Sequence, residues 1–221
     1  MPEVADVATY PDSVVYQLRV VLAGISPLIW RRLLVPATAT IAQLHTVVQT
    51  VFGWGGEHLH RFVIHGVEYG ICYVGGPGFR DDAGKVRLGE LGLRITERFA
   101  YEYNFTVGWR LDLRLEQIRA REPGRGYPYC TGGRRAGPPE GWAGPLDYLE
   151  RTQLSLVFDA TLRAAEIVGQ LLDADDDDDL ASIGVHRDEL TSLAPLLGLE
   201  RFDRRACNNA LAAPATEGSR V

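Results

Sequence analysis

The chain has 221 residues, 46% of them hydrophobic and 24% charged, with a formal net charge of −6. These proportions are typical of a globular protein and exclude a chain that is disordered throughout. No stretch approaches the ~18 consecutive apolar residues of a membrane span, and the acidic first residues do not form a secretory signal. The three cysteines form neither a CxxC pair nor an even disulfide framework, so we expect a cytoplasmic protein.

The charges are unevenly distributed. Six aspartates lie within Asp173–Asp179, and without them 29 − 6 = 23 acidic residues balance 23 basic ones. We interpret this run as a solvated linker between helices, because a calcium loop needs a glycine at Asp178 and a glutamate at Gly184. Between residues 110 and 135 the excess is 7 − 3 = +4, from Arg110, Arg114, Arg119, Arg121, Arg125, Arg134 and Arg135 against Asp112, Glu116 and Glu122. Such an excess suits a phosphate or an acidic partner, or else a solvated strand edge and loop.

The first half of the chain predicts strands around one helix. Alternating apolar residues indicate strands over 14–22 and 28–36, separated by a Gly/Ser/Pro turn. Thr40 and Gln43 form a capping box for an amphipathic helix over 41–52. A hairpin over 60–70 follows, and then an exposed, glycine-rich loop over 75–89.

The second half begins with strands over 101–107 and 109–116, joined at Val107-Gly108, with one aromatic and one charged face. A Gly/Pro-rich connection covers 122–145, and helices follow: one starting at Pro145, one capped by Asp159, and one near 188–197. The pattern predicts an α+β domain. Its mixed or antiparallel sheet would carry the early amphipathic helix, with further helices at the C-terminus. We place the flexible N-terminus at 1–12, the single domain at 13–210 and a disordered tail at 211–221.

Five motifs follow one another between about Tyr16 and Leu211: "GISPLIWRRLLVP", "GWGGEHLH", "YNFTVGW", "YPYCTGGRRAGPPE" and "LGLERFDRRACNNAL". In this order they resemble the plasmid pRiA4b ORF-3-like family, which includes proteins labelled as the TnpR passenger of an insertion sequence. The resemblance implies a single α+β domain and an association with plasmids or mobile elements, but no established activity. The matching residues are Trp30, Arg31, Arg32, Trp54, His58, His60, Tyr103, Trp109, Cys130, Pro138, Pro139 and Glu140.

The chain also departs from the family pattern. Thr106, Val107 and Leu111 stand where members commonly have Gly, Asp and His, so a site built from those residues is not carried over. Strand-transfer chemistry is rejected as well. Val21 and Leu22 occupy the positions of a serine recombinase nucleophile, and the tyrosines lie mostly in predicted strands and loops rather than on helices.

One alternative is a metal-dependent hydrolase or nuclease. In an extended segment His58 and His60 point to the same side, and Cys130 would complete a three-ligand set for zinc or another divalent metal. Glu140 would then serve as the general base. The competing interpretation is that the imidazoles bond loop carbonyls.

The leading hypothesis is a non-catalytic binding module. Alternation sends Arg31 and Arg32 to opposite sides of a strand, so one must be partly buried on a carboxylate or several carbonyls. Glu57, Glu68, Glu102 and Glu140 are the candidate carboxylates. The Gly/Pro connection with Arg134 and Arg135 would form an anion-binding nest for a protein or a nucleic acid, or would simply cover the sheet. The candidate binding residues are Trp30, Arg31, Arg32, Trp54, Arg134, Arg135 and Glu140.

Overall fold

The computed structural model describes residues 11–70, 78–79, 81–152, 154–173, 180–197 and 201–213. Most of the predicted flexible segment 1–12, most of the Asp173–Asp179 run and the end of the predicted tail 211–221 lie outside these residues. The last helix runs through Ala212 and so includes the first two residues of the predicted tail.

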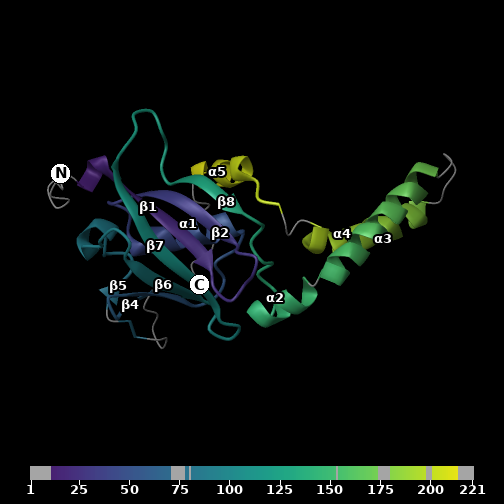
Figure 1. Cartoon of the computed structure of the whole chain (residues 1–221), viewed down its shortest axis with the longest axis horizontal. Helices are drawn as coiled ribbons and strands as arrows, with labels where there is room; N and C mark the ends of the chain where they lie inside the picture. Colours follow the sequence, from purple (N-terminus) through teal and green to yellow (C-terminus); the bar gives the residue numbers. More distant parts are fainter. Residues whose placement is uncertain are drawn as a thin grey trace.

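One sheet dominates the described part of the chain (Figure 1). Its strands are β1 (Val14–Leu22), β2 (Trp30–Pro36), β3 (His60–Ile64), β4 (Val67–Gly70), β5 (Asp81–Asp82), β6 (Arg98–Tyr103), β7 (Trp109–Ala120) and β8 (Tyr129–Arg134). They lie in the order β5-β4-β3-β6-β7-β1-β2-β8, and only the β4–β5 pair is parallel. This confirms the predicted mixed, mainly antiparallel sheet.

The early helix α1 (Ile41–Phe52) forms as predicted. The Thr40 hydroxyl accepts a hydrogen bond from the Gln43 amide at 3.1 Å, while the Gln43 side chain accepts one from the Thr40 amide at 2.9 Å. Gly53 ends the helix at φ 75°, a left-handed conformation that glycine adopts without strain.

Helix α1 lies against one face of the sheet, which we call the inner face. Its apolar side chains are buried together with inward residues of β1, β2, β6 and β7 in a single core. Fully buried members from these strands include Leu18, Leu33, Tyr101 and Leu113. The opposite face, which we call the outer face, has no described helix in front of β1 and β7 (Figure 1). The sheet is therefore covered on one side only.

The remaining helices are α2 (Pro145–Arg151), α3 (Leu154–Asp173), α4 (Leu180–Leu197) and α5 (Arg204–Ala212). Helices α3 and α4 pair and extend away from the sheet, whereas α5 lies on β8 and beside α1 (Figure 1). The predicted cap at Asp159 is wrong, because α3 begins at Leu154 and Asp159 lies inside it. No helix among the described residues is both long and apolar enough to cross a membrane.

Three predicted loops differ from the structure. The Gly/Pro-rich connection contains the edge strand β8, and the described part of the predicted exposed loop contains β5 and the buried Ala83 and Leu88. The turn between β6 and β7 begins at Asn104, whose φ is 53°, rather than at Val107. Phe105, which was assigned to the aromatic face, is therefore in the turn and 43% exposed.

Candidate functional site

The outer face of the sheet carries a line of arginines that crosses four neighbouring strands. Arg98 on β6 lies opposite Arg114 on β7, Arg114 opposite Arg19 on β1, and Arg19 opposite Arg32 on β2. We call these four residues the arginine row. Directly paired like charges destabilise a sheet, so folding alone gives no reason for this arrangement.

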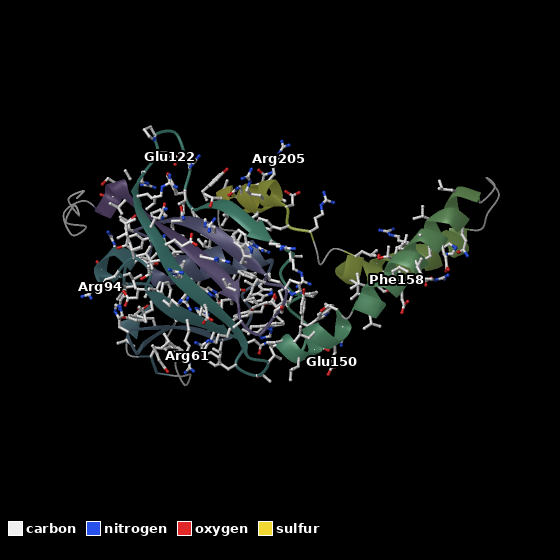
Figure 2. All side chains as sticks on the ribbon, viewed as in Figure 1. Arg61, Arg94, Glu122, Glu150, Phe158 and Arg205 are labelled. Carbon is white, nitrogen blue, oxygen red and sulfur yellow. The ribbon has the colours of Figure 1, made fainter. Side chains whose placement is uncertain are left out.

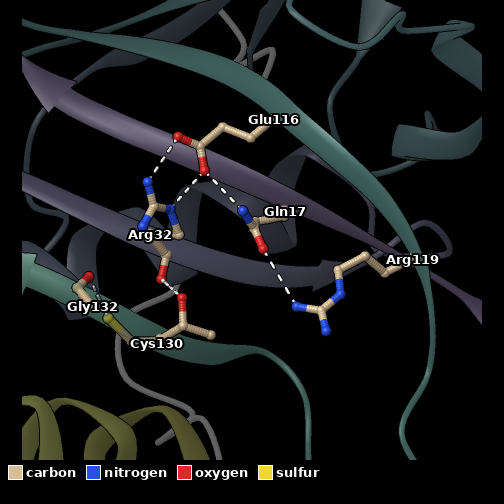
Figure 3. A network of polar contacts seen from close by, with 7 residues as sticks. Gln17, Arg32, Glu116, Arg119, Cys130 and Gly132 are labelled. Atoms are coloured by element: carbon tan, nitrogen blue, oxygen red, sulfur yellow. Dashed lines mark hydrogen bonds and ion pairs between the residues drawn. The ribbon is translucent and has the colours of Figure 1, made fainter.

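Only one member of the row has an ion-pair partner among the described residues. Arg32 donates from Nε and Nη2 to the two oxygens of Glu116, at 2.6 and 3.1 Å. Glu116 is the extra residue of a β-bulge in β7 and reaches across β1 to Arg32. Gln17 also donates to Glu116 at 2.9 Å, and Arg119 contacts Gln17 (Figure 3). The hydrogen bond from Arg32 lowers the pKa of Glu116 and keeps it ionised.

The other guanidinium groups of this surface keep hydrogen-bonding capacity. The Nε atoms of Arg19 and Arg114 are shielded from solvent and have no hydrogen-bond partner in the described part of the chain. Arg98 is exposed, and so is Arg134, which lies opposite Trp30 at the end of β8. Neither Arg98 nor Arg134 pairs with a described carboxylate at ion-pair distance, so both groups can receive an anion.

Aromatic rings lie among these arginines. The guanidinium carbons of Arg19 and Arg32 are 5.3 and 5.5 Å from the centre of the Trp30 ring. The corresponding distance from Arg125 to the Tyr129 ring is 5.0 Å. Both rings belong to strands at the β2–β8 edge and are half-buried.

Arg31 and Arg32 were predicted to point to opposite sides of their strand, and Arg31 is the buried one. It is 1% exposed and donates to the carbonyls of Val51, Trp30 and Arg134 at 2.9, 2.8 and 3.1 Å. Its guanidinium lies against the ring of Phe202, two residues before α5, 4.1 Å from the ring centre. Burial lowers its pKa to about 10, so it stays charged at neutral pH. Arg31 therefore has a structural environment and no access to a partner.

For the buried Arg31 the carbonyl alternative is confirmed, and none of the four candidate carboxylates is its partner. Arg32 pairs with Glu116, which was not among those candidates. The bulge at Glu116 is the physical reason, since it turns a side chain two strands away toward Arg32.

Arg134 and Arg135 do not form the expected pair of accessible guanidinium groups. Arg135 has φ 60°, is 4% exposed, and donates to the Pro27 carbonyl at 2.8 Å. Only Arg134 remains open to a partner. Of the two guanidinium groups in the predicted anion-binding nest, only that of Arg134 is therefore accessible. The reason is that β8 ends at Arg134 and the Arg135 side chain turns into the protein.

Trp54 and Glu140 connect the Gly/Pro segment to the core. The indole of Trp54 donates to the Pro138 carbonyl at 2.9 Å and stacks on Tyr103. Glu140 accepts hydrogen bonds from the Gly55 amide and the Tyr103 hydroxyl. Both residues belong to the motifs that resemble the family. Their contacts give them a structural role, because they attach the Gly/Pro segment to the chain just after α1.

The three predicted metal ligands are not brought together. His60 lies on β3 and stacks on His45 of α1, with ring centres 3.5 Å apart, while His58 is exposed beside Tyr103. Cys130 lies on β8, five strand positions from β3. Among the described residues no set of three His, Cys, Asp or Glu side chains is placed to hold a metal ion. This corrects the zinc-site prediction and removes the geometric basis of the hydrolase alternative.

Cys130 instead belongs to the contact between β8 and α5. The Asn208 side chain accepts from the Cys130 amide at 2.7 Å and donates to its carbonyl at 2.9 Å, which completes the hydrogen bonds of the edge strand. The neighbouring thiol of Cys207 is also buried and free.

The predicted binding residues did not include Arg19, Arg98 or Arg114, although Arg114 belongs to the basic excess noted between residues 110 and 135. Each stood at a polar position of a predicted or actual strand, and only the strand order and register bring them side by side. The alternation in "YQLRVVL" and "WRLDLRLE" was the available signal, because it assigned Arg19 and Arg114 to outward positions.

The fold and this surface define an α+β protein with one helix-covered sheet face and one open, arginine-bearing face. Comparison with known proteins identifies the family. Residues 14–166 match the family described as plasmid pRiA4b ORF-3-like protein, and the chain belongs to it. The chain is 31% identical over 140 residues to "Uncharacterized protein y4hQ" of Sinorhizobium fredii (strain NBRC 101917 / NGR234), covering 62% of this chain and 70% of that protein.

A solved structure has the same fold. It is the crystal structure of the "Protein of Unknown Function MM3350" from Methanosarcina mazei Go1, with a TM-score of 0.63 and 28% sequence identity. The match covers 88% of this chain and 96% of that chain. Neither the family description nor the names of these two relatives assign a biochemical activity.

Proposed function

We propose that the protein is a non-catalytic interaction module that binds an anionic partner through the outer face of its sheet. The observation that carries the proposal is the arginine row, in which only Arg32 has a carboxylate partner, Glu116, among the described residues. The charges of Arg19, Arg98 and Arg114 have no described counter-ion at ion-pair distance, so a bound anion would balance them.

This surface modifies the binding site expected from the sequence. Trp30, Arg32 and Arg134 remain in it, and Arg19, Arg98 and Arg114 join them. The Gly/Pro segment contributes β8 and Arg134, while Arg135 holds the segment to the turn before β2.

The net charge of −6 does not oppose this proposal. The excess acid comes from the aspartates of 173–179, and α3 reaches Asp173 at the end of the helical pair that extends away from the sheet (Figure 1). Charges farther apart than the Debye length, about 8 Å at physiological salt, are largely screened from each other. Within the arginine row the charge is locally positive, because Glu116 is its one ion-pair partner among the described residues.

The expected compartment is the cytoplasm. Cys130 and Cys207 are neighbouring, buried free thiols, a state that a reducing compartment maintains.

The test uses long-chain inorganic polyphosphate as the probe, with binding measured between about 50 and 200 mM salt. The variant Arg19→Gln/Arg98→Gln/Arg114→Gln removes three charges from the outer face. We expect it to weaken binding about tenfold or more and to flatten the salt dependence. The matched control, Arg94→Gln/Arg187→Gln/Arg201→Gln, removes the same charge from exposed positions elsewhere.

The control should bind polyphosphate much more tightly than the outer-face variant. Equal losses in the two variants would show that only net charge matters and would refute the proposed surface. Absence of polyphosphate binding by the unaltered protein would refute the proposed function itself.

A further inference from the structure

Three arginines near the outer face contact aromatic rings, which a surface that only forms ion pairs does not require. Arg19 and Arg32 flank Trp30, and Arg125 lies over Tyr129 (Figure 2 shows the dense side chains of this face). A guanidinium that lies on a ring uses one of its planar faces. Its other face can receive a nucleobase, and its N–H groups can still donate to phosphate oxygens.

The two stacked groups occupy one continuous path. Arg32 lies opposite Gly132, and Tyr129 lies opposite Leu34, four residues along β2 from Trp30. At roughly 3.4 Å per residue the path between the two rings is about 14 Å long. Gly132 contributes no side chain beside the Trp30 ring, so the backbone lies low between the two stacks.

Unpaired charges lie at this path. The arginine row starts at Arg32 and runs across the strands away from the path, and Arg134 lies opposite Trp30 at one end of it. Arg125 also pairs with Glu122 at 2.7 Å. A flexible chain that carries both planar bases and phosphates fits a surface that places ring-bound guanidinium groups beside others without a described carboxylate. An acidic peptide would use the charges but not the stacks, and a sheet face has no protruding helix to enter a duplex groove.

We infer that the anionic partner is a single-stranded nucleic acid, bound along the β2–β8 edge with bases on the guanidinium groups of Arg19 and Arg125 and phosphates on Arg134 and on the β2 end of the arginine row. This inference rests on the proposed function and specifies its partner. It assigns a role to Tyr129 and Arg125, which the charge argument leaves unused.

The test separates stacking from charge. In Arg19→Lys/Arg125→Lys the two charges remain while the planar groups over Trp30 and Tyr129 are lost. The matched control, Arg94→Lys/Arg187→Lys, makes the same exchange at two exposed arginines outside the proposed surface, for which no ring contact is described. Fluorescence anisotropy would measure binding of three probes of about 12 units each: single-stranded oligothymidine, a DNA duplex and polyglutamate.

We expect single-stranded DNA to bind more tightly than the other two probes. Arg19→Lys/Arg125→Lys should weaken that binding at least about fivefold, the smallest effect of losing a stacked base, and leave polyglutamate binding unchanged. The Arg94→Lys/Arg187→Lys control should bind single-stranded DNA as well as the unaltered protein.

Three other outcomes have distinct meanings. Binding of polyglutamate as tightly as single-stranded DNA, with no effect of the stacking variant, would overturn the nucleic-acid partner but keep the anion-binding surface. Tighter binding of the duplex would overturn the single-strand assignment. No binding of any probe, polyphosphate included, would refute the proposed function as well. Thermal unfolding of each variant identifies any loss that comes from misfolding.

Discussion

Arg31 and Arg32 are adjacent in sequence and have opposite environments. Arg31 is 1% exposed on the inner face, where three carbonyls and two aromatic rings surround its guanidinium. The side chain of Arg32 is 37% exposed on the outer face, where it joins three other arginines and one carboxylate. The pair shows that an arginine in a strand is not by itself a candidate for binding. Whether its guanidinium group can reach a partner depends on the face of the sheet to which it points.

The charged groups of the two faces differ in a similar way. On the inner side the carboxylate of Glu140 accepts from Gly55 and Tyr103, although the neutral Trp109 Nε1 and His60 Nε2 have no described partner. On the outer face like charges lie side by side and donors lack described partners, as at Arg114. Unsatisfied groups that weaken a fold tend to persist where a function requires them.

The largest expected effect on stability comes from replacing the buried Arg31. Arg31→Met removes the donor to three buried carbonyls and should lower the free energy of unfolding by about 3 kcal/mol or more. Arg31→Lys should recover only part of the loss, because an ammonium group cannot match the planar fork between Phe52 and Phe202. Urea unfolding measures both.

Arg32→Gln is the matched control for Arg31. Its ion pair with Glu116 is partly exposed, so the cost should stay below about 1 kcal/mol. Equal costs at the two positions would show that the faces do not differ in the way described.

A second prediction concerns buried histidines on the inner face. Burial and the neighbouring His60 lower the pKa of His45 to about 3, and burial lowers the pKa of His60 to about 4. Both values lie below the unfolded value of about 6.5, so the unfolded state binds more protons on acidification. Stability should be fully present above pH 6.5 and should fall as the pH drops toward 4, with each histidine contributing up to about 1.4 kcal/mol per pH unit.

The measurement is urea unfolding at several pH values from about 7 down to about 4, which starts above the pKa of an unfolded histidine and ends near the lowered pKa of His60. His45→Gln should reduce the slope, whereas His58→Gln, which removes an exposed imidazole, should leave it unchanged. An unchanged slope in His45→Gln would contradict the burial of a neutral imidazole against Tyr101.

Much of the fold followed from local patterns. The α1 capping box and the alternation of β1 and β7 are short-range signals. All three elements form where expected, and β7 continues from the predicted end at Glu116 to Ala120. Strand β8 was missed because Tyr129–Arg134 contains two glycines and no alternation. Its strand character comes from pairing with β2 and from Asn208, 78 residues away.

The candidate surface was less predictable than the fold. Alternation gave the outward direction of Arg19 and Arg114, but their adjacency depends on β1 inserting between β7 and β2. No single-sequence pattern encodes that strand order. The same limitation explains the metal prediction, in which residue types with suitable chemistry were combined without knowledge that β3 and β8 lie far apart in the sheet.

The smallest expected effect has the opposite sign and tests the cost of the arginine row directly. Arg114 lies between Arg98 and Arg19, and no described residue accepts from its Nε. Arg114→Gln should therefore stabilise the protein by a few tenths of a kcal/mol to about 1 kcal/mol, because it removes two like-charge cross-strand pairs. Since salt screens this repulsion, the gain should shrink in about 1 M salt. Arg110→Gln, at a position on the same strand that has Asp112 and Glu102 as partners, should give no such gain. A destabilising Arg114→Gln would mean that the arginine row contributes to the fold, and the argument that it is retained for a partner would then lose its basis.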